Sequence, residues 1–428
     1  MNYFDCEKEI LDIPKFSKKN TFEDTKGFFD FLKSPGEKSK IIHVAGTNGK
    51  GSVCSFMEGI LREHGYSCGL FTSPHLVTMR ERIKLDGQMI SEDDFCRIYA
   101  QVKDKARVYK AVYIPSFFEI LFFMAMVWFE EKGPDFIILE TGLGGRLDTT
   151  NVVEKKAASV ITKIAMDHME YLGNTLIDIA REKAGIIKNN IPLIYLDFDN
   201  EVSSLFEKKA KTVGARPIAV AADMEATVSN EGKCIDFSYD FKYDYVSSVR
   251  LRTPAKYQSM NASLALRTVE EVLADDFDKA KALDGLYKAY WPCRMEYVTE
   301  DILVDGAHNP DGVEALVESL SYIERDKLLL FSVVSDKDYE CMIRLLCRSG
   351  QFEKIVVASV GGSRRTDLEQ IVSLFKKYMP SNHGVIEAFY DAKDAYEYAT
   401  LHREGRLLVI AGSLYLAGAI SQIRKEGK

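Results

Sequence analysis

The sequence has eight cysteines in 428 residues but no Cys-x-x-Cys pair, and its seven histidines show no zinc-type spacing with them. A disulfide framework and a structural zinc site are therefore both disfavoured, and free thiols in a reducing cytosol are the simplest interpretation. The first fourteen residues are polar and acidic, unlike a signal peptide. The longest apolar run, residues 120–129, is too short to span a bilayer. We therefore expect a cytoplasmic protein without a membrane partner.

An excess of positive charge is also missing, because 56 Lys and Arg residues face 64 Asp and Glu residues, for a formal net charge of −8. This balance gives no support for a nucleic-acid or acidic-lipid partner, so any anionic ligand must be held by local groups. Neither an internal repeat nor a low-complexity segment is present, and the length suits two or three domains.

Short apolar runs alternate with amphipathic stretches along most of the chain, which predicts strands separated by helices. After a predicted strand at residues 40–45, apolar side chains recur with helical spacing from Val53 to Leu61, and Gly65 is placed to end that helix. Residues 117–131 predict another helix, and the polar residues 219–253 predict a hairpin region. Further strands are predicted at residues 69–72, 136–141, 158–164, 192–195, 302–305, 327–333, 354–358 and 406–411.

This alternation predicts an α/β fold with two domains. Residues 1–292 should form an N-terminal domain of the P-loop type, with a mostly parallel sheet flanked by helices. Residues 293–428 should form a smaller, Rossmann-like C-terminal domain. Trp291 and Pro292 lie at the predicted joint, because proline disfavours helix in the residue before it.

Glycines and a lysine lie between the first predicted strand and the helix after it, as a phosphate-binding loop requires. Backbone amides at the helix start favour an anion, and Lys50 can reach the outer phosphates of ATP. The spacing is irregular because Gly51 separates Lys50 from Ser52, and an ordinary strand–helix turn is the alternative. The predicted phosphate turn comprises Gly46, Thr47, Asn48, Gly49, Lys50, Gly51 and Ser52.

Other motifs follow the turn in order, at residues 72–76, 81–83, 140–148, 167–169, 172–173, 182–186, 291–294, 305–310 and 412–416. Together with the turn, they resemble the folylpolyglutamate synthase and dihydrofolate synthase family within the Mur ligase superfamily. The resemblance implies that ATP phosphorylates a carboxylate to an acyl phosphate. The amine of L-glutamate then attacks, on dihydropteroate, a reduced folate or both. It also implies Mg²⁺ and a monomer.

The resemblance implies that Ser73, Glu140 and His168 are magnesium ligands, with Lys183 acting beside them in a carbamylated form. Taken singly, Glu140 is better explained as an ordinary surface acid and His168 as a buried histidine, and the resemblance reverses this preference. Lys183 falls on the apolar stripe of a helix that begins after Thr175. A lysine that extends its charged end to solvent is the alternative there, and the sequence does not show the modification.

In the second half, the resemblance implies four nucleotide contacts. Arg294 would meet phosphates, Asp305 the ribose, and His308 the reacting end, while Asn261 would contact the nucleotide from the N-terminal domain. Lys50, Lys183 and His308 are the implied catalytic residues. The chain departs from the family where residues 254–256 replace a usual glycine. Residues 336–339 also resemble a family segment, with a solvated charged turn as the alternative.

Two segments match those that line the pteroate pocket of bifunctional members of the family. Aromatic side chains there can stack on a flat heterocycle, although most of these phenylalanines are better explained as core. The two arginines can pair with substrate carboxylates. The implied substrate-binding residues are Arg82, Ser116, Phe117, Phe118, Glu119, Arg146, Leu147, Asp148 and Thr149.

Two other enzyme classes compete with a folate ligase. A cell-wall Mur ligase is disfavoured because Gly51 follows Lys50 and no separate UDP-binding domain precedes residue 40. A P-loop kinase would transfer phosphate to an acceptor as its final product. A nucleotide-binding protein without catalysis is a third alternative, which the joint presence of Glu140, His168 and Lys183 disfavours.

Overall fold

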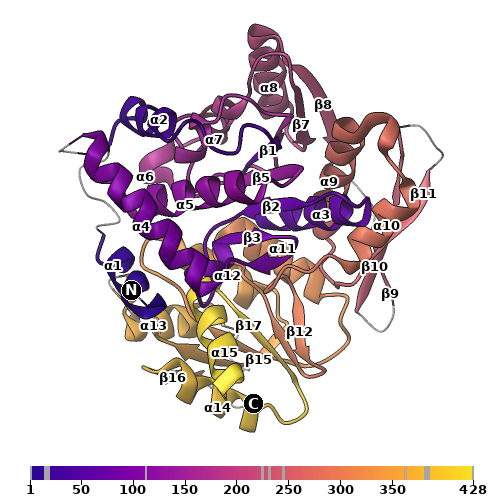
Figure 1. Ribbon diagram of the computed structural model, residues 1–428. Coiled ribbons are helices and arrows are strands. Elements are labelled where there is room, and N and C mark those ends of the chain that lie inside the picture. Colours follow the sequence, from indigo (N-terminus) through magenta and orange to yellow (C-terminus); the bar gives the residue numbers. More distant parts are fainter. Residues whose placement is uncertain are drawn as a thin grey trace.

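The computed structural model describes residues 2–13, 20–110, 113–222, 226–229, 233–242, 246–360, 362, 364–379 and 386–426. Within these ranges the strands form a large sheet, a small antiparallel sheet and a second α/β sheet. Figure 1 shows the first two in the upper body of the molecule and the third in the lower, orange-to-yellow body. This arrangement confirms the predicted α/β class with a larger N-terminal and a smaller C-terminal domain.

The large sheet has the order β4-β3-β2-β5-β1-β6-β7-β8, with β1 near its centre. Pairing is parallel from β2 to β8, and β3 and β4 add an antiparallel edge. Its strands are β1 (Lys40–Ala45), β2 (Cys68–Phe71), β3 (Ile83–Leu85), β4 (Gln88–Met89), β5 (Phe136–Glu140), β6 (Ala158–Ile161), β7 (Pro192–Asp197) and β8 (Arg216–Ala221).

Helices cover both faces of this sheet because alternate strand residues point to opposite sides. Ile42 and Val44 pack toward α3 (Lys50–Glu63), α9 (Gln258–Leu273) and α10 (Lys279–Lys288). Ile41 packs on the other side. The helices of that side are α1 (Tyr3–Leu11), α2 (Phe22–Phe31), α4 (Glu92–Tyr109), α5 (Phe117–Lys132), α7 (Leu176–Lys183) and α8 (Asn200–Val213).

The predicted hairpin region contains more structure than expected. β8 begins at Arg216 and joins the large sheet, so the separate unit starts later than residue 219. It is a three-stranded antiparallel sheet of β9 (Ala226–Ser229), β10 (Cys234–Tyr239) and β11 (Ser247–Leu251). Ile235 and Phe237 of β10 pack into the core shared with α3 and α9, which gives the sheet one buried face.

The C-terminal sheet has the order β12-β13-β17-β14-β15-β16 and is parallel except for β12. Its strands are β12 (Glu296–Thr299), β13 (Ile302–Val304), β14 (Lys327–Phe331), β15 (Phe352–Ala358), β16 (Ile386–Phe389) and β17 (Leu407–Ala411). One face packs on α11 (Pro310–Leu320), α12 (Tyr339–Arg348) and α13 (Leu368–Tyr378), and the other on α14 (Ala392–Leu401) and α15 (Leu414–Glu426).

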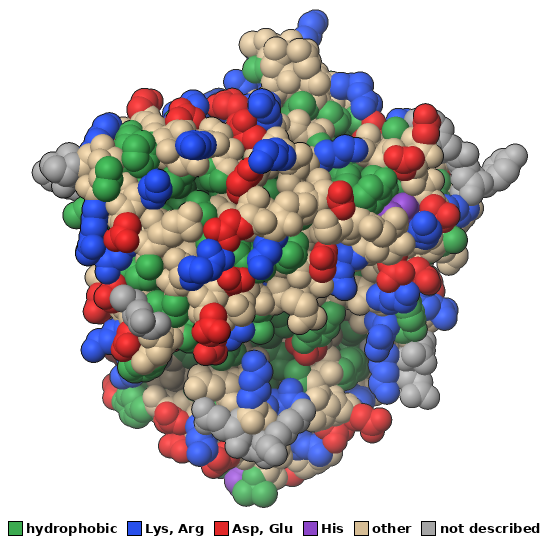
Figure 2. All heavy atoms as spheres, in the orientation of Figure 1, with side chains coloured by type: hydrophobic (Ala, Val, Ile, Leu, Met, Phe, Trp, Pro, Cys, Tyr) green, Lys and Arg blue, Asp and Glu red, His purple; other side chains and the backbone are tan. Residues whose placement is uncertain are grey.

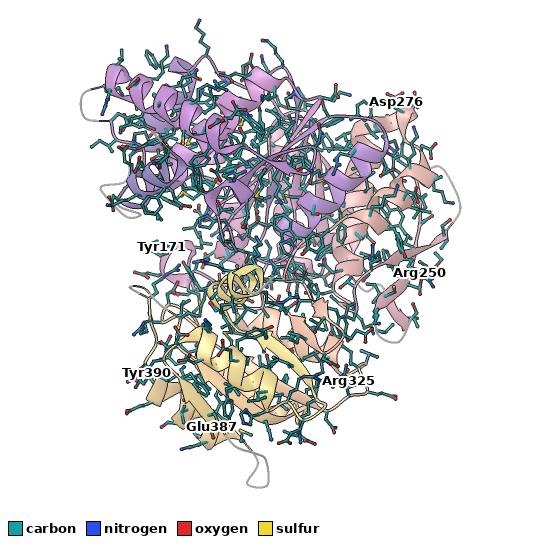
Figure 3. All side chains as sticks on the ribbon, turned by 60° about the horizontal axis from the view of Figure 1, so that its bottom comes forward. Tyr171, Arg250, Asp276, Arg325, Glu387 and Tyr390 are labelled. Atoms are coloured by element: carbon teal, nitrogen blue, oxygen red, sulfur yellow. The ribbon has the colours of Figure 1, made fainter. Side chains whose placement is uncertain are left out.

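Charged side chains of both signs are mixed on the surface that Figure 2 draws. In the part of the chain that the structure describes, no helix is both long and apolar enough to cross a membrane. In the turned view of Figure 3, Arg250 and Asp276 lie on the upper body, Arg325 and Glu387 on the lower one, and Tyr171 at the side between them.

Candidate active site between the two domains

The phosphate turn connects β1 to α3. Gly49 is the residue before α3 and no side chain caps it, so the first helical amides have no partner within the helix. The amides of Thr47 and Asn48 donate to the carbonyl of Lys163, at 2.9 and 3.3 Å. Because those two amides are already used, an incoming anion would be bound by the amides at the start of α3, where the helix dipole also favours it.

Glycines are required in this turn for reasons that the structure shows directly. Gly46 and Gly49 both have positive φ angles, which other residues rarely adopt. A Cβ atom on Gly51 would lie 2.6 Å from the indole of Trp291. The glycine that makes the spacing irregular therefore lets Trp291 lie against the first turn of α3.

Lys50 and Glu140 face one another beside the turn. The Lys50 ammonium donates to the carbonyl of Thr47 at 3.1 Å and lies 3.9 Å from Glu140 Oε1. Glu140 ends β5, is 3% exposed, and accepts the backbone amide of Ser73 at 2.9 Å on Oε2. Burial raises the pKa of Glu140, and Lys50 most strongly opposes that rise. The pair thus sits where strand ends of an α/β sheet place ligands.

Lys183 is buried rather than directed to solvent. The predicted helix start holds, since Thr175 accepts the amide of Asp178, and α7 ends at Lys183. The Lys183 side chain is 4% exposed, and its ammonium donates to the carbonyl of Gly46 at 2.7 Å. Burial, followed by the charge of Lys50, lowers the pKa of Lys183 to about 7. A neutral amine is therefore accessible at ordinary pH next to the phosphate turn.

Asp167 and Lys337 form an ion pair across the two domains. Lys337 Nζ lies 2.6 Å from Asp167 Oδ1, and Asn309 donates to Oδ2 at 3.1 Å. Burial raises the pKa of Asp167, but Lys337 and His168 outweigh it and hold the value below its ordinary range. Residues 336–339 are therefore not simply a solvated turn. Lys337 was absent from the predicted site residues, although its motif gave a signal.

His168 and His308 lie on either side of Asp167. Their Nε2 atoms are 3.9 and 4.0 Å from Asp167 Oδ2. Burial, followed by the charge of Lys337, lowers the pKa of each histidine to about 4. Both imidazoles are therefore neutral at physiological pH, so His168 can act as a metal ligand through a nitrogen lone pair.

A second set of polar contacts joins the turn to α11. Asn48 donates to Asp311 Oδ2 at 2.7 Å and exchanges hydrogen bonds with Asn309 at 3.0 and 3.2 Å. Lys163 lies 2.5 Å from Asp311 Oδ1. The two domains are thus closed on each other at the phosphate turn.

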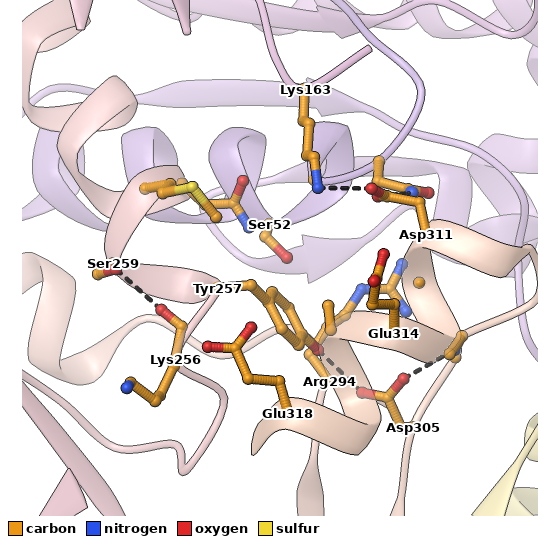
Figure 4. A pocket seen from close by; sticks show the side chains of 18 of the residues that line it. Ser52, Lys163, Lys256, Tyr257, Ser259, Arg294, Asp305, Asp311, Glu314 and Glu318 are labelled. Atoms are coloured by element: carbon orange, nitrogen blue, oxygen red, sulfur yellow. Dashed lines mark hydrogen bonds and ion pairs between the residues drawn. The ribbon is translucent and has the colours of Figure 1, made fainter. Parts of the chain in front are cut away.

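A cavity of about 410 Å³ opens beside this junction, within the size range of small-molecule sites. Figure 4 shows Arg294, Asp305, Glu314 and Glu318 around it, with Lys163 paired to Asp311 above. Gly49, Ser52, Asn261 and His308 also contribute to its lining. Predicted nucleotide residues from both domains therefore line one cavity, although Gly46, Thr47, Lys50 and Gly51 are not among its lining residues.

Asp305 is anchored at the edge of this cavity. It accepts the hydroxyl of Tyr257 at 2.9 Å and the amides of Met295 and Ala307 at 2.8 and 2.7 Å. Burial raises its pKa, and Arg294 opposes the rise. The loop that precedes Tyr257, residues 254–256, lacks the glycine that is usual in the family.

That loop is held by its own side chain and backbone. The amide of Ala255 donates to Thr253 Oγ1 at 3.1 Å, and the amide of Gln258 donates to the carbonyl of Ala255 at 3.0 Å. Gln258 then reaches Ser52 Oγ at 3.1 Å and accepts from Asn261 at 2.8 Å. Although residues 254–256 lack the family's usual glycine, Gln258 at the start of α9 still contacts the phosphate turn through Ser52.

Glu119 is saturated by contacts within the chain. Ser116 caps α5, and its amide donates to Glu119 Oε2 at 2.8 Å. Thr25 Oγ1 donates to Oε1 at 2.6 Å, and Asn20 Nδ2 to Oε2 at 3.0 Å. Both carboxylate oxygens therefore have partners before any substrate arrives.

The two phenylalanines before Glu119 belong largely to the core. Phe117 is buried, with the Arg82 guanidinium 5.4 Å from its ring centre. Arg82 is itself buried and donates to His75 Nδ1 at 2.8 Å, and burial lowers its pKa to about 10. Phe118 packs against Phe71, with ring centres 5.6 Å apart.

The remaining predicted substrate residues follow β5. Asp148 accepts the amides of Gly142 and Leu143 at 2.9 and 2.8 Å and so closes the glycine-rich loop. Arg146 pairs with Glu182 at 2.9 Å. Leu147 is 46% exposed, and Thr149 begins a short 3₁₀ helix. None of these contacts tests a substrate role, which stays a prediction.

Both halves of the chain match domain families. Residues 44–269 match the Mur ligase middle domain, and residues 293–414 match the Mur ligase glutamate ligase domain. A relative from Bacillus subtilis named dihydrofolate synthase/folylpolyglutamate synthase is 34% identical, across 100% of this chain and 99% of its own length.

Solved structures agree over the whole chain. A Mycobacterium tuberculosis folylpolyglutamate synthase complexed with ADP superposes with a TM-score of 0.89 at 26% identity, covering 98% of each chain. A structure titled as a complex of such a synthase with AMPPCP and folate gives 0.84 at 27% identity, covering 99% of this chain and all of its own.

Proposed function

Because the chain belongs to the folylpolyglutamate synthase and dihydrofolate synthase family of Mur ligases, we propose that it adds L-glutamate to dihydropteroate, to reduced folates, or to both. It is an ATP-dependent acid–amino-acid ligase. The observation that carries the proposal is the contact of the phosphate turn with Glu140 and Lys183, together with a cavity that residues of the turn and of the C-terminal domain line.

The reaction has two steps. A carboxylate oxygen of the pterin substrate attacks the γ-phosphorus of ATP, which gives an acyl phosphate and ADP. The amine of glutamate then attacks the acyl carbon, and phosphate leaves as the amide forms. The chain's part is to hold the phosphates at the start of α3, to place the Lys50 charge beside them, and to exclude water by domain closure.

The proposed magnesium site contains Ser73, Glu140 and His168. Among the described residues, no three His, Cys, Asp or Glu side chains converge as a metal cluster. The single carboxylate of Glu140 nevertheless fits the way Mg²⁺ is held by one or two carboxylates together with substrate phosphates. Glu140 and the neutral imidazole of His168 would hold the ion. Bound there, Mg²⁺ would neutralise charge on the phosphates.

Lys183 is the proposed site of carbamylation. Its buried amine is neutral in part near pH 7, and a neutral amine adds to carbon dioxide to give a carbamate and a proton. The carbamate would replace a buried cation by an anion able to organise magnesium and phosphate. A mass increase of the intact chain that disappears in Lys183→Ala would support it.

On the nucleotide, we propose that Arg294 contacts phosphates, Asp305 the ribose and Asn261 the nucleotide from the other domain, with His308 near the reacting end. Their support is that all four line the same cavity. The proposed division at residues 292 and 293 is supported by the start of the second family match at residue 293. The proposal includes a monomer, and the eight free thiols suit a cytoplasmic enzyme.

Two findings support folate substrates. The relatives are named as dihydrofolate and folylpolyglutamate synthases, and one similar structure is a complex with AMPPCP and folate. A cell-wall ligase shares the domain families but not these full-length relatives. A P-loop kinase has no place for a glutamate ligase domain over residues 293–414.

The test offers dihydropteroate and tetrahydrofolate separately to the purified enzyme, with ATP, Mg²⁺ and labelled glutamate. We expect labelled amide product and stoichiometric phosphate release, each dependent on both the pterin substrate and glutamate. Phosphate transferred to the acceptor without glutamate would identify a kinase instead. A product from one substrate alone would assign one activity of the two.

A further inference from the structure

A chain of four polar side chains lies buried behind the phosphate turn. His43 of β1 is fully buried, with Nδ1 2.7 Å from Lys156 Nζ and Nε2 2.7 Å from Thr150 Oγ1. Thr150 Oγ1 lies 2.6 Å from Asp148 Oδ1. The order is therefore Lys156, His43, Thr150 and Asp148, and all four side chains are buried.

Burial, followed by the charge of Lys188, lowers the pKa of Lys156 well below 10.5. We assign Lys156 as the donor to His43 Nδ1, as it is to Asn151 Oδ1, which puts the imidazole proton on Nε2. That proton goes to Thr150 Oγ1, whose own hydroxyl hydrogen goes to Asp148. Burial, followed by the charge of Lys156, lowers the pKa of His43 well below 6.5, in agreement with a neutral ring. His43 and Thr150 thus connect a buried lysine to a buried aspartate.

Each link in this chain holds a segment that carries a candidate site residue. His43 lies three residues before Gly46, on the strand that leads into the phosphate turn. Asp148 Oδ2 takes the amides of Gly142 and Leu143, directly after the segment of Glu140.

The other end of the chain reaches the segment after Lys183. Lys156 donates to Asn151 Oδ1 at 3.0 Å and to the carbonyl of Ile186 at 3.4 Å. Asn151 in turn donates to the carbonyl of Gly185 at 3.2 Å. Three segments that are far apart in sequence are therefore fixed against one another by a single polar core.

We propose that His43, Thr150 and Lys156 are positioning residues that set the register of the phosphate turn, the glycine-rich loop after Glu140 and the segment after Lys183. This inference rests on the proposed function, because those segments carry its catalytic residues. A core that only stabilised the fold would not need this directed chain, since well-packed apolar groups serve that purpose as well as buried charges do.

The test compares Thr150→Val with Thr150→Ser. Valine keeps the shape but removes the hydroxyl that joins His43 to Asp148, whereas serine keeps it. For Thr150→Val we expect kcat to fall roughly 10- to 100-fold, as for groups that orient ligands of a site, with KM for ATP changed less than about threefold. Thr150→Ser should stay near the wild type. Thr268→Val, a buried hydroxyl bonded to its own helix carbonyl, is the control for loss of a hydroxyl elsewhere.

A double variant separates positioning from general destabilisation. If Thr150 and Lys156 act through one chain, Thr150→Val with Lys156→Met should lose little more kcat than the worse single variant. Multiplied losses, or full activity in Thr150→Val, would overturn the proposal. A loss of kcat that follows thermal stability equally in Thr150→Val and Thr268→Val would do the same.

Nitrogen NMR of the histidine side chains gives a readout that needs no substrate. We expect the His43 ring to carry its proton on Nε2 near neutral pH, and Thr150→Val to change the Nε2 shift while leaving Nδ1 an acceptor. A ring protonated on Nδ1 would contradict the chain. Failure of the folate assay in the wild type would instead reject the proposed function and leave this readout interpretable.

Discussion

The phosphate turn and the segment around Glu119 are both predicted to bind substrate, but their polar groups are used differently. The first amides of α3 have no side-chain cap and no partner within the helix. Glu119, by contrast, has donors on both carboxylate oxygens, from Thr25 on one and from Asn20 and Ser116 on the other. One region presents open hydrogen-bonding groups to a ligand, whereas the other has used them to join α5 to the preceding chain.

The number of unpaired polar groups distinguishes residues that can contact a ligand from residues that hold the surrounding structure in place. Glu119 already accepts four hydrogen bonds, about as many as a carboxylate can, so a donor from a substrate would displace an existing one. Asp305 accepts three and keeps a position for a ligand. Asp148 resembles Glu119 in this respect, because Oδ2 accepts the amides of Gly142 and Leu143 and Oδ1 accepts the amide and hydroxyl of Thr150. We therefore expect substitutions in the turn to impair turnover, and substitutions at Glu119 to impair stability first.

Lys50→Met should give the largest effect. It removes the charge beside the phosphates while keeping most of the side-chain volume, so we expect kcat to fall by at least roughly 10³-fold. The thermal unfolding midpoint should change far less than turnover, because Lys50 is half-buried and its contacts are a backbone carbonyl at 3.1 Å and Glu140 at 3.9 Å. Steady-state kinetics and calorimetry measure both. Lys38→Met, on the surface, is the matched control, and near-normal turnover in Lys50→Met would remove the turn from the site.

Gly51→Ala should come next. The added Cβ would lie 2.6 Å from Trp291, so the indole or the start of α3 must shift. A displacement of the helix amides by a fraction of an ångström should lower kcat on the order of 10²-fold. The double variant Gly51→Ala with Trp291→Ala should recover part of that loss. If Gly51→Ala alone keeps full activity, the helix start does not set the phosphate position.

Much of the first domain could be predicted from the sequence because its signals are local. β1 and β5 are apolar runs bounded by glycine or polar residues, and the turn is contiguous. The short edge strands β12 and β16 were not predicted, since half-buried strands of four residues give a weak pattern. A sequence also does not show which polar groups are already paired. Thr25 and Asn20 meet Glu119 across more than ninety residues, and Lys337 meets Asp167 only because two domains dock.

Glu119→Gln tests whether Glu119, whose carboxylate oxygens both have partners within the chain, serves stability rather than substrate binding. The neutral amide must present an NH₂ group to at least one of the present donors, which leaves a buried bond unmade. We expect the free energy of unfolding to fall by about 1–3 kcal/mol and KM for the pterin substrate to change less than about threefold. Denaturant unfolding and steady-state kinetics check the two numbers. Glu131→Gln, near the exposed end of the same helix, is the control. A large rise in KM at unchanged stability would assign Glu119 to the substrate.

His308 lies between the two extremes, because one of its ring nitrogens has a hydrogen-bond partner among the described residues and the other does not. Nδ1 is used by the carbonyl of Gly306 at 2.8 Å, whereas Nε2 faces Asp167 Oδ2 at 4.0 Å. Because burial and Lys337 lower its pKa from 6.5 to about 4, the unfolded chain binds a proton below pH 6.5 that the folded protein does not bind until about pH 4. The folded state should therefore lose stability as pH falls through this window, by up to about 3 kcal/mol from His308 alone. In His308→Gln, denaturant unfolding between pH 7 and 4.5 should show a correspondingly shallower decline. Parallel curves for the two proteins would mean that His308 is protonated in the folded state, and that its Nε2 is held by Asp167 rather than open to a ligand.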